Sequence, residues 1–190
     1  YRFNTPRADG VPTYSIRCAS SKDGGRTWTK PSIVAEAAGE GHGLWASFLH
    51  RTSKGSIQCY YDDEDTPNNQ GFKNHQWITM KTLNRKTRRW AGPVTVSRTS
   101  TPNELARDGM CSICELTDTR YICVFESVST SRRTPEDARP AVIRMVESKN
   151  AGRAWNWREG RPIVYEPAGL FMAFSPWTVR LESGNVLCVF

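Results

Sequence analysis

The sequence predicts an all-β protein built from repeated four-stranded sheets. Seven Trp, six Tyr and seven Phe occur together with 14 Gly and 11 Pro, which suits many short strands joined by tight turns better than long helices. Two unrelated markers, one a tryptophan and one a cysteine, also recur with nearly the same period. A period that holds four strands is typical of one blade of a β-propeller.

The tryptophan marker precedes a proline and a pair of β-branched residues in each period. Trp28, Trp90 and Trp155 are spaced by 62 and 65 residues. The segments that follow them are Lys-Pro-Ser-Ile-Val at 30–34, Gly-Pro-Val-Thr-Val at 92–96 and Arg-Pro-Ile-Val at 161–164. Each segment predicts a turn that leads into a strand.

The cysteine marker lies inside an apolar, alternating segment. Cys59, Cys123 and Cys188 are spaced by 64 and 65 residues. Because equivalent positions in a repeat meet equivalent neighbours, we interpret them as one packing position in the second strand of each blade. Cys111 and Cys114 form a Cys-x-x-Cys pair, but no second pair or histidine cluster stands at zinc-ligand spacing. We therefore expect structural thiols, no metal site and no cofactor.

Six further alternating segments complete the four strands of each period. They lie at 45–50, 110–115, 176–181, 15–19, 77–81 and 142–146. We expect one propeller domain over residues 1–190, with repeats at roughly 1–41, 42–106 and 107–170 and a partial repeat at 171–190. Because this phase begins and ends inside a repeat, we expect the rest of the propeller to lie outside the given sequence.

The charge and hydropathy patterns argue against two classes of partner. The net charge is +7, but the basic residues are scattered, which favours a solvated basic surface over a nucleic-acid site. A basic cleft for an acidic sugar is the alternative interpretation. No apolar run approaches the roughly 18 residues of a membrane helix, and no signal-peptide pattern begins the chain. We expect neither a nucleic acid nor a membrane as partner.

A turn motif accompanies the tryptophan repeat. Residues 21–28 fit Ser-x-Asp-x-Gly-x-Thr-Trp, the Asp-box, and residues 148–155 are a partial copy. In such a turn the Asp or Asn caps backbone donors, Gly takes a positive φ, and Trp seals the seam between strands. The residues assigned to these structural roles are Ser21, Asp23, Gly25, Trp28, Asn150, Gly152 and Trp155. The middle copy has Arg85 and Thr87 in place of Asp and Gly, so it keeps only Trp90.

Five segments carry a resemblance to a known family across nearly the whole chain. They are Gly43-Leu44-Trp45, Gln58-Cys59-Tyr60-Tyr61 followed by Glu64, Arg107-Asp108-Gly109-Met110, Val124-Phe125-Glu126-Ser127, and Arg161-Pro162-Ile163-Val164-Tyr165. In this order they resemble the Asp-box glycoside hydrolases of the sialidase-like group, and among them most of all the exo-arabinanases of glycoside hydrolase family 93. The resemblance implies a secreted enzyme, a six-bladed propeller and a sugar-cleaving site at the mouth of its central channel.

Glycoside cleavage generally uses two carboxyl groups that flank the scissile bond. The resemblance marks Glu126 as catalytic, and its place at the end of an apolar strand would carry it toward the channel mouth. A solvated strand-end Glu is the alternative. The second family Glu should follow Trp45, but Ala46 stands there. Glu64 matches another family Glu and is the nearest substitute, although the acidic run at 62–65 equally fits an exposed loop.

Three further kinds of residue are candidates for the site. Asp108 begins the first strand of a blade, where Asp108 and Arg107 could clamp a sugar or tune Glu126; alternatively, Asp108 shapes the turn before Gly109. The aromatic candidates for stacking on sugar faces are Trp45, Tyr61 and Trp177. Most aromatic residues in such strands instead pack between sheets.

The expected function is that of an exo-arabinanase-like hydrolase that removes terminal units from a polysaccharide. An exo-sialidase is the second hypothesis, because Arg7 and Asp9 precede the first Asp-box much as an Arg and the acidic Asp do in sialidases. The third is a non-catalytic propeller that binds glycans or proteins, which Ala46 supports.

Overall fold

The computed structural model describes residues 1–39, 42–64, 75–100, 105–130, 141–168 and 172–190, and within these ranges every regular element is a β-strand. The first sheet contains β1 (Arg2–Pro6), β2 (Pro12–Cys18) and β3 (Ser32–Ala38), and the second contains β4 (Leu44–Arg51), β5 (Ile57–Asp63), β6 (Trp77–Asn84) and β7 (Arg89–Ser97). The third contains β8 (Leu105–Glu115), β9 (Tyr121–Thr130), β10 (Val142–Ser148) and β11 (Ile163–Tyr165), and the fourth contains β12 (Trp177–Arg180) and β13 (Val186–Val189). No helix in the described ranges is long and apolar enough to cross a membrane.

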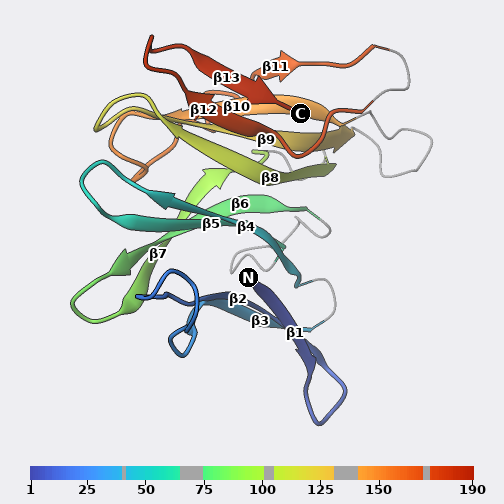
Figure 1. The fold of residues 1–190 in the computed structure, drawn as a ribbon. Helices are drawn as coiled ribbons and strands as arrows, with labels where there is room; N and C mark the ends of the chain where they lie inside the picture. The colour runs from blue at the N-terminus through green and yellow to red at the C-terminus, as the bar shows by residue number, and fades with distance from the viewer. Residues whose placement is uncertain (40–41, 65–74, 101–104, 131–140, 169–171) are drawn as a thin grey trace.

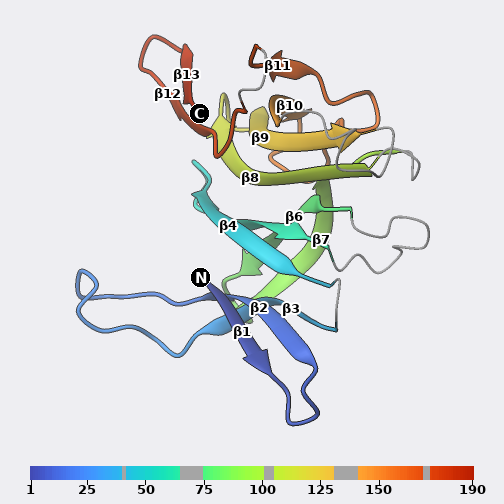
Figure 2. The ribbon, with the colours of Figure 1, turned by 90° about the vertical axis from the view of Figure 1, so that its right-hand side faces the viewer.

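The four sheets follow one another as blades do in a propeller. All strand pairs are antiparallel neighbours in chain order, and Figures 1 and 2 show the sheets in succession from the first to the fourth. The edge strands β4 and β8 contact each other between the second and third sheets, and β8 and β12 do so between the third and fourth. The all-β propeller architecture predicted from the repeats is thereby confirmed.

Alternation along β5 decides which side chains enter each seam between sheets. Cys59 and Tyr61 pack toward the first sheet, whereas Tyr60 packs into the cluster shared with the third. Cys123 packs in that cluster and Cys188 packs against the third sheet from the fourth. Each repeat cysteine thus faces the preceding sheet, which agrees with the predicted single packing position. Tyr61 is only 2% exposed. The prediction that Tyr61 stacks on a sugar is therefore wrong, because its ring is buried against the first sheet.

The turns at 21–28 and 148–155 close with the same hydrogen bonds. Ser21 Oγ accepts the Gly25 amide at 2.8 Å, and Ser148 Oγ accepts the Gly152 amide at 2.9 Å. In the first turn the Thr27 amide and hydroxyl both donate to Asp23, and these bonds lower the pKa of that carboxyl to about 2. In the second turn Asn150, Ala154 and Trp155 reproduce the pattern without a charge, since Asn150 Oδ1 accepts the Ala154 amide at 2.8 Å.

The two turn tryptophans lie in opposite environments. Trp155 is 6% exposed and meets Tyr60 of the second sheet edge-on, with ring centroids 6.1 Å apart. Gln58 of the same strand donates to the Ala151 carbonyl at 2.9 Å. Trp28 is 64% exposed, although its indole donates to the Gly25 carbonyl at 2.9 Å. Among the described residues no other sheet lies against Trp28, so its role in sealing a seam stays a prediction.

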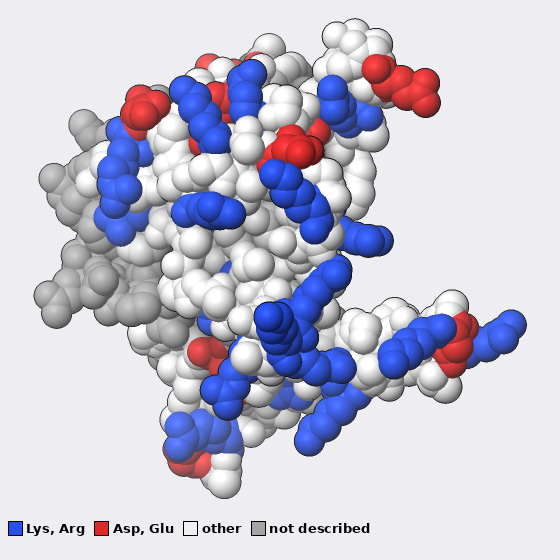
Figure 3. Space-filling view, turned by 90° about the vertical axis from the view of Figure 1, so that its left-hand side faces the viewer, with Lys and Arg blue, Asp and Glu red and all other residues white. Residues whose placement is uncertain are grey.

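Basic side chains are spread over the surface, as their scatter in the sequence indicates. Figure 3 shows Lys and Arg over much of one face of the molecule, with Asp and Glu among them. Two of the exposed pairs are Arg120 with Glu147 at 2.7 Å and Lys54 with Asp118 at 3.7 Å. Exposed pairs of this kind contribute about 0–1 kcal/mol each, so the fold does not depend on them.

We predict that Trp155→Ala lowers the free energy of unfolding by about 3–5 kcal/mol, the usual cost of removing a large buried aromatic side chain. The matched variant Trp28→Ala should cost less than about 1 kcal/mol, because that ring is exposed. Urea titrations followed by circular dichroism measure both. Equal destabilisation by the two variants would contradict the different roles assigned to the two turns.

Candidate functional site

Glu126 lies on β9, at the edge of a seam between sheets. It pairs in register with Gly109 of β8 on one side and Ile143 of β10 on the other. The side chain is half-buried, and its Oε2 accepts the Ser175 amide at 2.7 Å. Burial raises the pKa of the Glu126 carboxyl, and the hydrogen bond from Ser175 only partly opposes this. The residue is thus held in place with its protonated form favoured.

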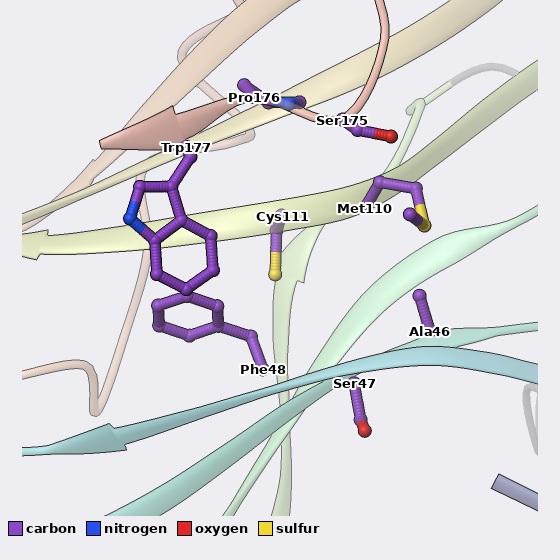
Figure 4. A pocket seen from close by; sticks show the side chains of 8 residues that line it. All are labelled: Ala46, Ser47, Phe48, Met110, Cys111, Ser175, Pro176 and Trp177. Atoms are coloured by element: carbon purple, nitrogen blue, oxygen red, sulfur yellow. The ribbon is translucent and has the colours of Figure 1, made fainter. Parts of the chain in front are cut away.

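A cavity of about 140 Å³ lies between the edge strands of three sheets, and Ser175, whose amide binds the Glu126 carboxyl, forms part of its wall. Figure 4 shows its walls, which are Ala46, Ser47, Phe48, Met110, Cys111, Ser175, Pro176 and Trp177. The Ala46 methyl points toward Met110, so an apolar wall stands where the resemblance calls for a carboxylate. Trp177 is exposed, and it meets the Phe48 ring at 5.3 Å and 60°. The indole can therefore offer a stacking surface to a ligand in the cavity.

A second carboxyl is fixed by an ion pair with β8. Glu64 follows β5 directly and pairs with Arg107 of β8. Gln76 holds the same guanidinium through its Oε1 at 2.9 Å, and its Nε2 donates to the Asp108 carbonyl at 3.1 Å. The Arg107 side chain is 36% exposed. Arg107 is thus pre-oriented and can still reach a ligand hydroxyl or carboxylate.

Two glycines allow the acidic groups to approach the backbone. A Cβ on Gly43 would lie 2.5 Å from Glu64 Oε2 and 2.4 Å from Trp45 Nε1. A Cβ on Gly109 would lie 2.8 Å from Asp62 Oδ2 and 2.4 Å from Gln76 Nε2. A side chain at either position would displace these groups from their present places, so the two glycines allow the observed close approach.

Asp108 is the centre of a buried polar network. Its carboxylate accepts both Ser97 Oγ and Ser127 Oγ at 2.7 Å, and Arg161 Nη1 at 2.6 and 2.7 Å. The Asp108 side chain is 0% exposed. The network joins β7 of the second sheet to β8, β9 and residue 161 of the third. It favours a positioning role for Asp108 over the direct catalytic role that the sequence suggested.

Asp62 is a carboxyl that the sequence reasoning did not select. It is 2% exposed, and both of its oxygens accept the Met110 amide, at 3.1 and 3.2 Å. Met110 has a φ of 48°, a left-handed conformation that is costly for a residue with a side chain. Burial raises the pKa of Asp62 well above its ordinary value. The alternation of side chains along β5 could have indicated this residue, since Asp62 lies on the same face of the strand as Tyr60, which packs toward the third sheet.

The structure brings together some of the sequence-predicted residues and separates others. Glu126, Glu64, Arg107, Asp108 and Trp177 all lie on or next to the seams between the second, third and fourth sheets. Trp45 lies under the Arg2 guanidinium, 3.8 Å from the ring centroid, so one face of its indole is already covered. Among the described residues, no group of three or more His, Cys, Asp and Glu could hold a metal ion.

Two residues that suggested a sialidase lie in an exposed turn. Arg7 and Asp9 pair with each other at 3.5 Å in the loop that joins β1 to β2, and both side chains are more than half exposed. Figures 1 and 2 place this loop at the end of the molecule away from the third sheet. The described geometry gives Arg7 and Asp9 no contact with Glu126.

We predict that Arg161→Met costs about 3–5 kcal/mol of unfolding free energy, because it leaves the buried Asp108 carboxylate without its cation. The matched variant Arg120→Met, which breaks an exposed pair, should cost no more than about 1 kcal/mol. Thermal and urea unfolding of the two variants check the difference. A small effect of Arg161→Met would show that the buried Asp108 carboxylate does not depend on this ion pair.

No protein-family model and no curated protein sequence matches the chain. Solved structures do match. An α-L-arabinanase of Penicillium chrysogenum, complexed with arabinobiose, superposes with a TM-score of 0.68 at 18% identity, covering 99% of this chain and 57% of that one. The GH93 α-L-arabinofuranosidase of Fusarium graminearum, also with arabinobiose, gives 0.64 at 21% identity with the same coverage. A protein of unknown function from Dyadobacter fermentans gives 0.58 at 11% identity, covering 97% of this chain and 54% of that one.

These likenesses bear on the fold. The chain spans 57% of the length of the two arabinan-related structures, and its sheets superpose on theirs. At these identities the chemistry of the matched enzymes does not transfer by itself. The chain has the fold of part of a six-bladed, sialidase-like propeller, the fold that the GH93 enzymes share.

Proposed function

We propose that this protein is a secreted glycoside hydrolase that removes terminal units from a polysaccharide, as an exo-arabinanase does. The observation that carries the proposal is Glu126, a half-buried carboxyl fixed by the Ser175 amide beside a cavity between the first strands of the sheets. The fold is shared with enzymes solved in complex with arabinobiose, which supports arabinan as the first substrate to test.

Each residue of the site receives a role from its surroundings. Glu126 is the general acid, because burial favours the protonated form that can donate to a leaving oxygen. Glu64 is the second carboxyl, and Arg107 beside it orients a sugar hydroxyl. Asp108 positions Arg107 and Glu126 through the backbone of β8 and β9. Trp177 supplies the stacking surface at the cavity.

A non-catalytic carbohydrate-binding propeller is the second candidate function. Ala46 is the observation that favours it, because the family resemblance calls for a catalytic Glu at this position. The cavity walls next to Ala46 are mainly apolar and aromatic, which suits the apolar face of a sugar as well as a reacting glycoside. The two functions differ in whether a bound oligosaccharide is released intact.

We predict that Glu126→Gln lowers kcat for arabinan oligosaccharides by about 10²–10⁴-fold, the usual contribution of a general acid. The amide keeps an oxygen that can accept the Ser175 N–H, so the fold should be retained. Glu36→Gln, on the exposed face of β3, is the matched control. Chromatographic analysis of the released sugars measures the rate.

Three outcomes of this experiment would contradict part of the proposal. Equal activity of Glu126→Gln and Glu36→Gln would remove Glu126 from the mechanism. Cleavage of sialosides instead of arabinan oligosaccharides would identify a sialidase. Binding of an arabinan oligosaccharide by calorimetry, without any product, would establish the non-catalytic function.

The direction of the pH dependence follows from the raised pKa of Glu126. If the protonated carboxyl is the active form, kcat is highest below this pKa and declines as the pH rises through it. We therefore expect the alkaline limb of the kcat profile to lie above the ordinary titration range of glutamate. A limb at the ordinary glutamate value would contradict the role of burial in tuning this group.

A further inference from the structure

Asp62 belongs to β5, the strand next to the edge strand β4 that lines the cavity. In the second sheet Leu44 pairs with Asp63 and Ser47 with Tyr61, so a bulge of β4 that includes Ala46 lies opposite Asp62. The carboxyl of Asp62 crosses the seam to the third sheet, where it accepts the Met110 amide. The chain therefore lacks an acid at Ala46 and has one at the neighbouring position of the adjacent strand.

Gly109 places Asp62 near Glu126. Residues paired across antiparallel strands carry side chains on the same face, with Cβ atoms about 4.5–5.5 Å apart, and Gly109 pairs with Glu126. The Cβ direction of Gly109 points at Asp62 Oδ2, 2.8 Å away. Asp62 and Glu126 thus both border this face of the third sheet at Gly109, where the space that a Cβ would take is filled by Asp62 and Gln76.

Several charged or titratable groups face Asp62 from the elements around it. From β8 these are Arg107, Asp108 and the thiol of Cys111, and from β9 it is Glu126. On β6 its register partner is the apolar Ile78. Arg107 is already paired with Glu64, and Asp108 with Arg161. The cations nearby are therefore paired with other acids. Burial is the main cause that opposes a charge on Asp62, and Glu126 and Asp108 add to it, whereas the hydrogen bond from the Met110 amide and the Arg107 charge offset it in part.

We propose that Asp62 is a positioning residue of the site: a buried carboxylic acid that keeps its proton above the pH at which an exposed aspartate loses it, and that clamps the Met110 turn against the cavity. The inference rests on the proposed function for its link to catalysis, but the protonated state of Asp62 does not depend on that function. In this arrangement the acid that is missing at Ala46 is replaced by a buried acid on the adjacent strand.

The stability of the protein tests the protonated state without any substrate. When a folded carboxyl keeps a proton that the unfolded chain has lost, stability falls as the pH rises above the ordinary value of about 4. This fall continues until the folded group also ionises, and each pH unit raises the unfolding equilibrium constant by up to about tenfold. Asp62→Asn carries no such proton and should lack this contribution.

The experiment compares urea unfolding of the wild type, Asp62→Asn and the control Asp118→Asn between pH 5 and 8. Asp118 is 65% exposed. We expect the stability of Asp62→Asn relative to wild type to rise steadily with pH, by several-fold per unit in the unfolding constant, and that of Asp118→Asn to stay level. A level difference for Asp62→Asn would overturn the proposal.

Activity on arabinan oligosaccharides tests the positioning role. Asp62→Ala loses the clamp on Met110 and should lower kcat by about tenfold, the equivalent of roughly one hydrogen bond. Asp62→Asn keeps an acceptor and should be several-fold more active than Asp62→Ala. Equal loss in both variants would overturn the proposal, because it would show that an acceptor for the Met110 amide does not restore the site. A wild type that cleaves nothing would refute the proposed function alone, since the unfolding experiment would still report on Asp62.

Discussion

The buried contact between Asp108 and Arg161 is the interaction on which the site most depends. Each sheet of a propeller can bury its faces only against its neighbours, and apolar seams tolerate small sliding movements. Asp108 removes this freedom, because its oxygens take donors from Ser97 in the second sheet and from Ser127 and Arg161 in the third. A fully buried carboxylate needs all of these partners, so the sheets must meet in one register.

That register positions the groups proposed to act on a sugar. Arg107 precedes Asp108 and meets Glu64, while Gly109 follows it and meets Asp62. Glu126 pairs directly with Gly109. Three residues of β8, Arg107, Gly109 and Met110, therefore contact or pair with acids from β5, its following loop and β9. One of the five segments that resemble the family is thus also the segment through which the site is built.

The sequence predicted the sheets well because their signals are local and repeated. The tryptophan and cysteine periods indicated the blade-like units, and the cysteines pack as equivalent positions should. The aromatic candidates were harder. Alternation reverses facing at each residue, so Tyr61 is buried against the first sheet while Tyr60 and Asp62 face the third. Trp28 kept its hydrogen bond within the turn, but its burial depends on a neighbouring sheet, which local sequence cannot report.

Among the acids of the site, local sequence could select one, whereas the roles of the others depend on contacts between residues far apart in the chain. Glu126 could be selected from its strand and from the family resemblance. Asp62 appeared as one acid in a run, since its contact with Met110 joins residues 48 positions apart. Arg161 likewise meets Asp108 across 53 positions. Only the three-dimensional arrangement showed that Asp108 is locked away from solvent and that Asp62 borders the cavity wall.

The most direct test of the account is a crystal structure of the protein soaked with arabinobiose. The account predicts that the sugar occupies the cavity between Ala46 and Trp177, with its glycosidic oxygen within about 2.6–3.2 Å of the Glu126 carboxyl. Arabinobiose bound at another surface, or an empty cavity at saturating sugar, would contradict the placement of the site.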